Sequence, residues 1–167
     1  MKEKNFLIWL WLFLTITTSG CSLSKELTRD KKSANEALLL EAIDKRSFVV
    51  EVDRAHPLTG ESRMLTTLYS LEVNGEKVKS HLPYFGRAYS VPYGGGDGLI
   101  FESVITDYQS STKKKGETVL SFKAKTKEDH FVYRVYLSPS GTASIDITSI
   151  HRHPISFTGK AYPKKEE

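Results

Sequence analysis

The sequence predicts a mainly β domain, an antiparallel barrel or sandwich of about eight strands with one helix at its N-terminal side. From Phe48 onward, apolar and polar residues alternate in short segments, which is typical of strands with one solvated face. Turn-forming residues separate these segments, and a stretch with helical spacing precedes them. Many short strands within one domain favour a barrel or a sandwich.

The helix is expected over residues 33–46. Ser33 and Glu36 form a capping-box pattern, in which each side chain satisfies a main-chain N–H at the start of a helix. An apolar stripe is expected to pack on the sheet and consists of Ala34, Ala37, Leu38, Leu40 and Ile43.

The strands are expected near residues 48–53, 66–73, 76–82, 99–108, 118–125, 131–137, 143–150 and 155–161. Asn74-Gly75 predicts a type I′ hairpin turn between the second and third strands, because both residue types tolerate positive φ.

The N-terminus predicts export and a lipid anchor. Basic residues at the start, an apolar run from Phe6 to Ile16 and the small pair Ser19-Gly20 have the layout of a secretory signal. The run is shorter than the roughly 20 apolar residues that span a bilayer. With Cys21 following directly, the segment resembles the lipobox of bacterial lipoproteins, in which the cysteine becomes the acylated N-terminus. The alternative is an uncut membrane anchor with Cys21 as an ordinary thiol.

These signals divide the chain into a signal peptide (residues 1–20), a lipidated cysteine with a polar tether (21–32) and one β-rich domain (33–167). The tether lacks the acidic cluster that is associated with surface export in Bacteroides-type lipoproteins, so we expect the periplasmic face of the outer membrane. Loss of residues 1–20 lowers the basic residues from 24 to 22 and the acidic residues from 20 to 19, leaving a net charge of +3. Scattered basic residues and export together argue against a nucleic-acid partner, and no cofactor motif is present.

Residues 81–98 form the unusual segment, HLPYFGRAYSVPYGGGDG. Its prolines and glycines exclude the middle of a sheet, and its aromatic residues are too many for a disordered linker. One interpretation is a ligand-binding rim formed by Tyr84, Phe85, Arg87, Tyr89, Tyr93 and Asp97. The alternative is structural: the tyrosines cap the open end of the sheet and Arg87 pairs locally.

Four stretches resemble a known family: Leu82-Pro83-Tyr84-Phe85-Gly86-Arg87-Ala88-Tyr89, Pro92-Tyr93-Gly94, Ile100-Phe101 and Ile155-Ser156-Phe157-Thr158-Gly159. Over about residues 46–161 the chain is similar to Bacteroides-type lipoproteins with domain of unknown function 4251 (DUF4251). The resemblance implies an exported, β-rich domain and brings no catalytic residue.

His151 and His153 are weak candidates for a metal pair, because residues two apart in a strand share one face. No nucleophile elbow is present, and Glu102 and Asp107 lie at opposite parity of one expected strand. The sequence therefore favours a non-catalytic binding module for a small hydrophobic or glycan ligand, held at the membrane through Cys21. An envelope protein interaction domain is the alternative, and a hydrolase without a recognisable motif is the third.

Overall fold

The computed structural model describes residues 23–89, 98–113 and 116–164, with side chains from residue 34 onward. The described part of the chain divides into two units between Asn35 and Glu36. Helix α2 spans Leu23–Asp44, and its last part belongs to the second unit. The strands are β1 (Ser47–Pro57), β2 (Arg63–Asn74), β3 (Lys77–Leu82), β4 (Leu99–Thr112), β5 (Thr118–Lys125), β6 (His130–Leu137), β7 (Thr142–Ser149) and β8 (Ile155–Pro163).

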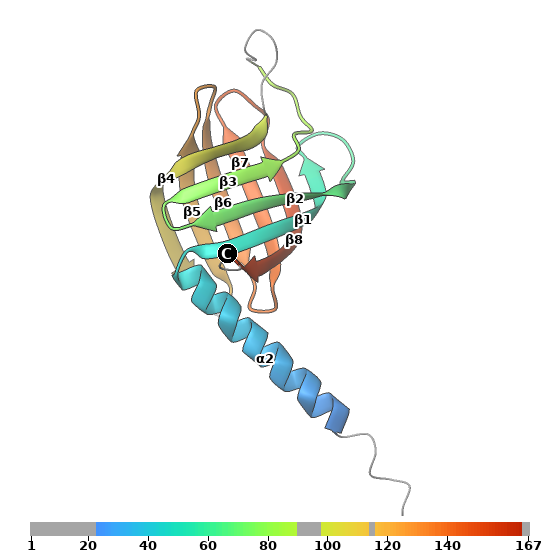
Figure 1. Cartoon of the computed structure of the whole chain (residues 1–167). Coiled ribbons are helices and arrows are strands. Elements are labelled where there is room, and N and C mark those ends of the chain that lie inside the picture. Colours follow the sequence, from blue (N-terminus) through green and yellow to red (C-terminus); the bar gives the residue numbers. More distant parts are fainter. Residues whose placement is uncertain (1–22, 90–97, 114–115, 165–167) are drawn as a thin grey trace, which may run out of the picture. The chain divides into compact units, whose positions relative to one another are not determined.

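The eight strands form a closed antiparallel barrel in chain order, with β8 pairing back onto β1 (Figure 1). The predicted fold class is confirmed, and closure decides in favour of the barrel over the sandwich. Inward-facing residues alternate with outward-facing ones, most regularly in β5 and β6. Within the described residues, no helix is both long and apolar enough to cross a membrane.

Aromatic side chains fill one part of the barrel interior. The ring centroids of Phe101 and Phe131 are 5.1 Å apart, as are those of Phe122 and Tyr133, and both pairs are stacked. The buried Tyr133 hydroxyl donates to the Ser80 hydroxyl (3.2 Å), which donates in turn to the main-chain carbonyl of Leu99 (2.7 Å). Burial of Tyr133 raises its pKa far above the ordinary value, so the phenol remains a neutral donor.

Helix α2 differs from the prediction at both its start and its buried face. It begins at Leu23, ten residues before the predicted start at Ser33, so most of the predicted tether is helical. The predicted stripe is wrong except for Ile43: the buried residues are Leu39, Ala42 and Ile43, whereas Ala34, Ala37, Leu38 and Leu40 are exposed. Leu38, Leu39 and Leu40 are consecutive and point to different sides of a helix, so periodicity alone did not identify the buried side.

The β2–β3 hairpin is confirmed, but its turn lies one residue later than predicted. Asn74 pairs with Lys77, so the loop residues are Gly75 and Glu76. Gly75 has a φ of +60°, and among these residues it alone has a positive φ. Glycine at the first loop position is the pattern of a type II′ turn rather than type I′.

At one end of the barrel, β4 begins several residues beyond the point where its neighbour β5 ends, and this offset forms the candidate site. β4 pairs with β3 from Leu99 onward, but its ladder with β5 begins only at Ile105, opposite Ala124. The chain turns toward β6 directly after Lys125. The first five residues of β4, from Leu99 to Ser103, therefore continue past the end of β5.

Candidate functional site

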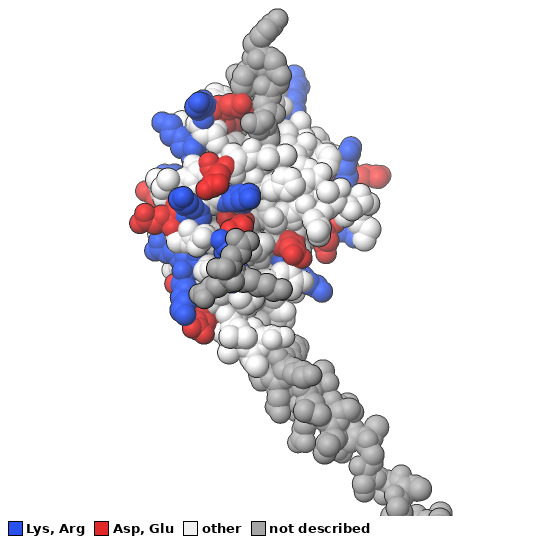
Figure 2. All heavy atoms as spheres, viewed as in Figure 1, with Lys and Arg blue, Asp and Glu red and all other residues white. Residues whose placement is uncertain are grey.

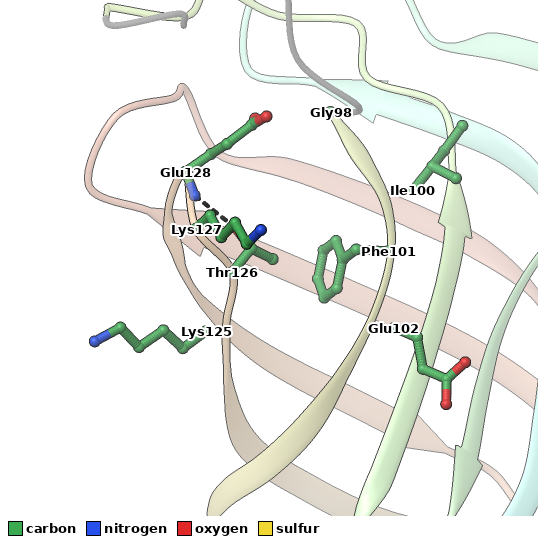
Figure 3. Close-up of a pocket in the computed structure, with 8 residues that line it drawn as sticks. All are labelled: Gly98, Ile100, Phe101, Glu102, Lys125, Thr126, Lys127 and Glu128. Carbon is green, nitrogen blue, oxygen red and sulfur yellow. Dashed lines mark hydrogen bonds between the residues drawn. The ribbon is translucent and has the colours of Figure 1, made fainter.

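A groove of about 550 Å³ lies where β4 continues beyond β5. One wall comes from the start of β4 and the other from the β5–β6 turn; the lining residues are Gly98, Ile100, Phe101, Glu102, Lys125, Thr126, Lys127 and Glu128. In Figure 3 the Phe101 ring extends from β4 toward Thr126, while Ile100 and Glu102 lie on the other side of the strand. The volume falls within the range of small-molecule and peptide sites.

The wall formed by the β5–β6 turn is held by its own hydrogen bonds. The Thr126 hydroxyl accepts from the main-chain N–H groups of Glu128 (3.2 Å) and Asp129 (3.1 Å), and it donates to the Asp129 carbonyl (3.3 Å). Across the closed end of the groove, the Ser103 hydroxyl donates to the Lys125 carbonyl (2.7 Å). The two walls are therefore linked at Ser103 and separate toward Gly98.

The main chain of β4 forms an open edge along this groove. In an antiparallel ladder, alternate residues direct both main-chain groups to the same neighbouring strand. The N–H of Ile105 donates to the Glu76 carbonyl (2.7 Å), on the β3 side, so residues of the same parity face β3. Ile100 and Glu102 have the other parity and direct their N–H and C=O groups toward the groove. Within the described residues, β5 pairs with no residue of β4 before Ile105.

A buried charge cluster lies behind the β5–β6 turn. The Arg152 side chain is only 7% exposed and lies 3.4 Å from a Glu128 oxygen and 3.6 Å from Asp129 Oδ2. The Asp129 side chain is 1% exposed, and its Oδ1 accepts from the N–H of His130 (2.8 Å). Neither Asp129 Oδ2 nor Arg152 Nε has a hydrogen bond within the described residues. Glu128 thus connects the groove to the buried Arg152.

Main-chain hydrogen bonds hold residues 83–89 against the segment that follows β7. The N–H of Tyr89 donates to the His151 carbonyl (2.8 Å), and the N–H of His153 donates to the Arg87 carbonyl (3.0 Å). The Tyr84 hydroxyl lies within hydrogen-bond distance of two carbonyls, those of Arg87 (3.0 Å) and His153 (3.1 Å). Burial raises the pKa of Tyr84 above its usual value, and the nearby Arg152 guanidinium partly opposes this shift. Tyr84 therefore holds the segment in place as a neutral donor.

Comparison with known proteins assigns the chain to a family. The family model described as "Domain of unknown function (DUF4251)" matches residues 30–161. The chain belongs to the DUF4251 family. A crystal structure of a DUF4251 family protein from Bacteroides eggerthii DSM 20697 is similar, with a TM-score of 0.62 and 18% sequence identity over 80% of this chain and 91% of that one. No curated protein matches the sequence.

Of the six predicted rim residues of this DUF4251 domain, the structure describes Tyr84, Phe85, Arg87 and Tyr89, which differ in exposure and in their contacts. Phe85 is half-buried beneath the Arg63 guanidinium (5.0 Å to the ring centroid), whereas Arg87 is exposed. Tyr89 is 64% exposed, and its ring meets that of His153 edge-on at 5.1 Å. Tyr93 and Asp97 lie outside the described residues.

The groove residues of the DUF4251 domain were missed by the sequence interpretation. Phe101 entered only through a stretch that resembles the family, and Thr126 lies between two expected strands. Arg152 lies between the two histidines that were considered as a metal pair, and nothing in the sequence around it indicates burial. No local pattern indicated that β4 is longer than β5 at this end.

The histidine pair does not lie in a strand as predicted. β7 ends at Ser149, so the parity argument that placed His151 and His153 on one face is wrong. Both contribute main-chain groups to the fastening of residues 83–89. In the part of the chain that the structure describes, no group of three His, Cys, Asp or Glu residues is placed to hold a metal ion.

A second groove of about 300 Å³ lies on the outer face of β1, β2 and β8 and is lined by Glu51, Val52, Asp53, Leu65, Thr66, Thr67, Leu68, Lys160 and Tyr162. It forms where the β1–β2 register shifts between Val52 and Arg54. On the face shown in Figure 2, basic and acidic side chains are interspersed.

Proposed function

We propose that this DUF4251 domain is a non-catalytic binding module of the cell envelope and that the groove between β4 and the β5–β6 turn is its binding site. The supporting observation is the open edge of β4 beside Phe101. Main-chain donors and acceptors that line a groove favour a partner that hydrogen-bonds to them.

Of the two ligand classes that the sequence predicts, the groove favours an envelope protein over a small hydrophobic or glycan ligand. Stacked aromatic rings occupy the barrel interior around Tyr133, which disfavours a ligand enclosed there. One wall of the groove is a strand edge, and such edges are used for peptide recognition.

The anchor is part of the same proposal. Acylation of Cys21 at the end of a signal peptide would hold the domain at the periplasmic face of the outer membrane. Because the anchored domain stays at the membrane, a partner at the same membrane is present at a high local concentration. Even a weak interaction with the groove then keeps the groove largely occupied.

The test is the native mass spectrum of the lipidated protein purified gently from its own membrane. We compare Lys127→Trp, which places an indole at the groove, with Lys160→Trp at the second groove. Both residues are exposed lysines, so the two variants change charge and volume equally. We expect a bound mass on the wild type and on Lys160→Trp that is lost from Lys127→Trp. A bare wild-type protein, or a bound mass that survives Lys127→Trp, contradicts the proposal.

A further inference from the structure

We infer that the partner of the groove is an extended peptide segment that adds to the open edge of β4 as an extra strand. This inference rests on the proposed function and names the partner chemistry of the same site. It is carried by the juxtaposition, along one groove, of main-chain groups that no described strand pairs with, a half-buried aromatic ring and two exposed lysines.

The main-chain groups determine the class of partner. Ile100 and Glu102 present N–H and C=O groups at a two-residue repeat, about 7 Å along the strand. An extended peptide presents its own donors and acceptors with the same repeat, so it pairs with both residues at once. β5 supplies this pairing from Ile105 onward, and the peptide continues the ladder where β5 has turned away.

The length of the edge limits the paired segment. Ser103 is linked to Lys125 through its hydroxyl, so the open part runs from that link to the start of β4 at Leu99. At about 3.4 Å per residue, this part accommodates a paired segment of about five residues.

The side chains of the walls predict the sequence pattern of the peptide. Phe101 is half-buried, lines the groove and stacks on Phe131, so a peptide side chain on the same face meets an apolar surface. The next peptide residue along faces outward, where Lys125 and Lys127 are exposed on the opposite wall. Lys79 lies opposite Glu102 in the β3–β4 register, and Glu128 on the wall of the turn lies 3.4 Å from Arg152. Lys125 and Lys127 are therefore the positive charges that the groove offers to a partner. The expected segment alternates apolar with polar residues and carries an acidic residue.

The two sides of β4 provide a discriminating pair of substitutions. Proline lacks an N–H, and in sheets it is tolerated where that N–H would face away from a neighbouring strand. Glu102→Pro removes a donor that faces the groove and leaves the ladder with β3 intact. Ser103→Pro removes a donor to Val78 on β3 and should destabilise the barrel. Glu102→Ala is the matched control, because it removes the same carboxylate and retains the N–H.

The experiment uses a phage-displayed library of random octapeptides, selected on the full-length protein in detergent. We expect enriched peptides with the alternating, acidic pattern, whose affinity falls at least tenfold for Glu102→Pro and less than threefold for Glu102→Ala. N-methylation of alternate peptide amides should give the same loss in one register and little loss in the other. This second measurement remains decisive if Glu102→Pro does not fold.

Each outcome separates the peptide inference from the choice of groove. If Lys127→Trp abolishes peptide binding but Glu102→Pro and N-methylation do not, strand addition is overturned. The groove then remains the binding site. Peptides unaffected by Lys127→Trp overturn the groove itself. Failure to enrich any peptide overturns the inference, whereas a bound mass in the native spectrum that Lys127→Trp removes still supports the proposed function.

Discussion

Replacement of Arg152 by methionine should destabilise the domain strongly, because it leaves the buried Asp129 carboxylate without its counter-charge. The side chains of this pair are 7% and 1% exposed, and their closest charged atoms are 3.6 Å apart. Removal of one partner from a buried ion pair costs about 3–5 kcal/mol, because the remaining charge stays desolvated. For a domain of this size, we expect the melting temperature to fall by about 10 °C or more.

The control is Lys123→Met, which removes a shorter but exposed pair. Lys123 lies 2.7 Å from Asp107, yet the two side chains are 57% and 61% exposed. Exposed pairs contribute about 0–1 kcal/mol, so distance and burial make opposite predictions about which loss is larger.

Urea unfolding at pH 7 gives the free energy of unfolding of both variants. Addition of Asp129→Asn to Arg152→Met should recover about 1–2 kcal/mol, because the uncompensated charge is then removed. A loss for Arg152→Met no larger than that for Lys123→Met would refute the assignment of a buried charge cluster.

Three further predictions follow from other parts of the chain. The high pKa of Tyr133 keeps the folded state protonated while the unfolded chain ionises near pH 10, so stability should fall above that pH by up to about 1.4 kcal/mol per unit. In Tyr133→Phe, the free energy of unfolding measured with urea should fall less steeply with pH above pH 10, by about 1.4 kcal/mol per pH unit, which corresponds to one proton. An unchanged slope contradicts this prediction. Gly159→Ala should lower thermal stability by at least about 1–3 kcal/mol, because an added Cβ would lie 2.7 Å from Val52 Cα; a melting temperature equal to that of the wild type contradicts the close packing of β8 on β1. Cys21→Ala should move the protein from the membrane to the soluble fraction, and retention in the membrane argues against lipidation.

The strands could be predicted from sequence because burial in this barrel alternates residue by residue. In β5, the buried residues Leu120, Phe122 and Ala124 are separated by polar ones, so the period of two is visible in any window. The hairpin after β2 could also be predicted from local sequence, because a glycine at this point predicts a turn even when its exact position in the turn is one residue off.

The groove could not be predicted because it depends on non-local pairing. The open edge exists only because β4 pairs with β3 from Leu99 and with β5 from Ile105. The position of Arg152 depends likewise on contacts with Asp129, which lies 23 residues earlier in the chain. Sequence patterns predict which residues face inward, but not where two neighbouring strands separate.

Amide hydrogen exchange of the free protein, read residue by residue, tests the open edge of β4 most directly. The amides of Ile100 and Glu102 should exchange at least about 100-fold faster than those of Phe101 and Ser103, which face β3; this ratio corresponds to a difference of about 2.7 kcal/mol. Equal protection of all four amides would show that the edge is already covered and would contradict the groove as a site for an added strand.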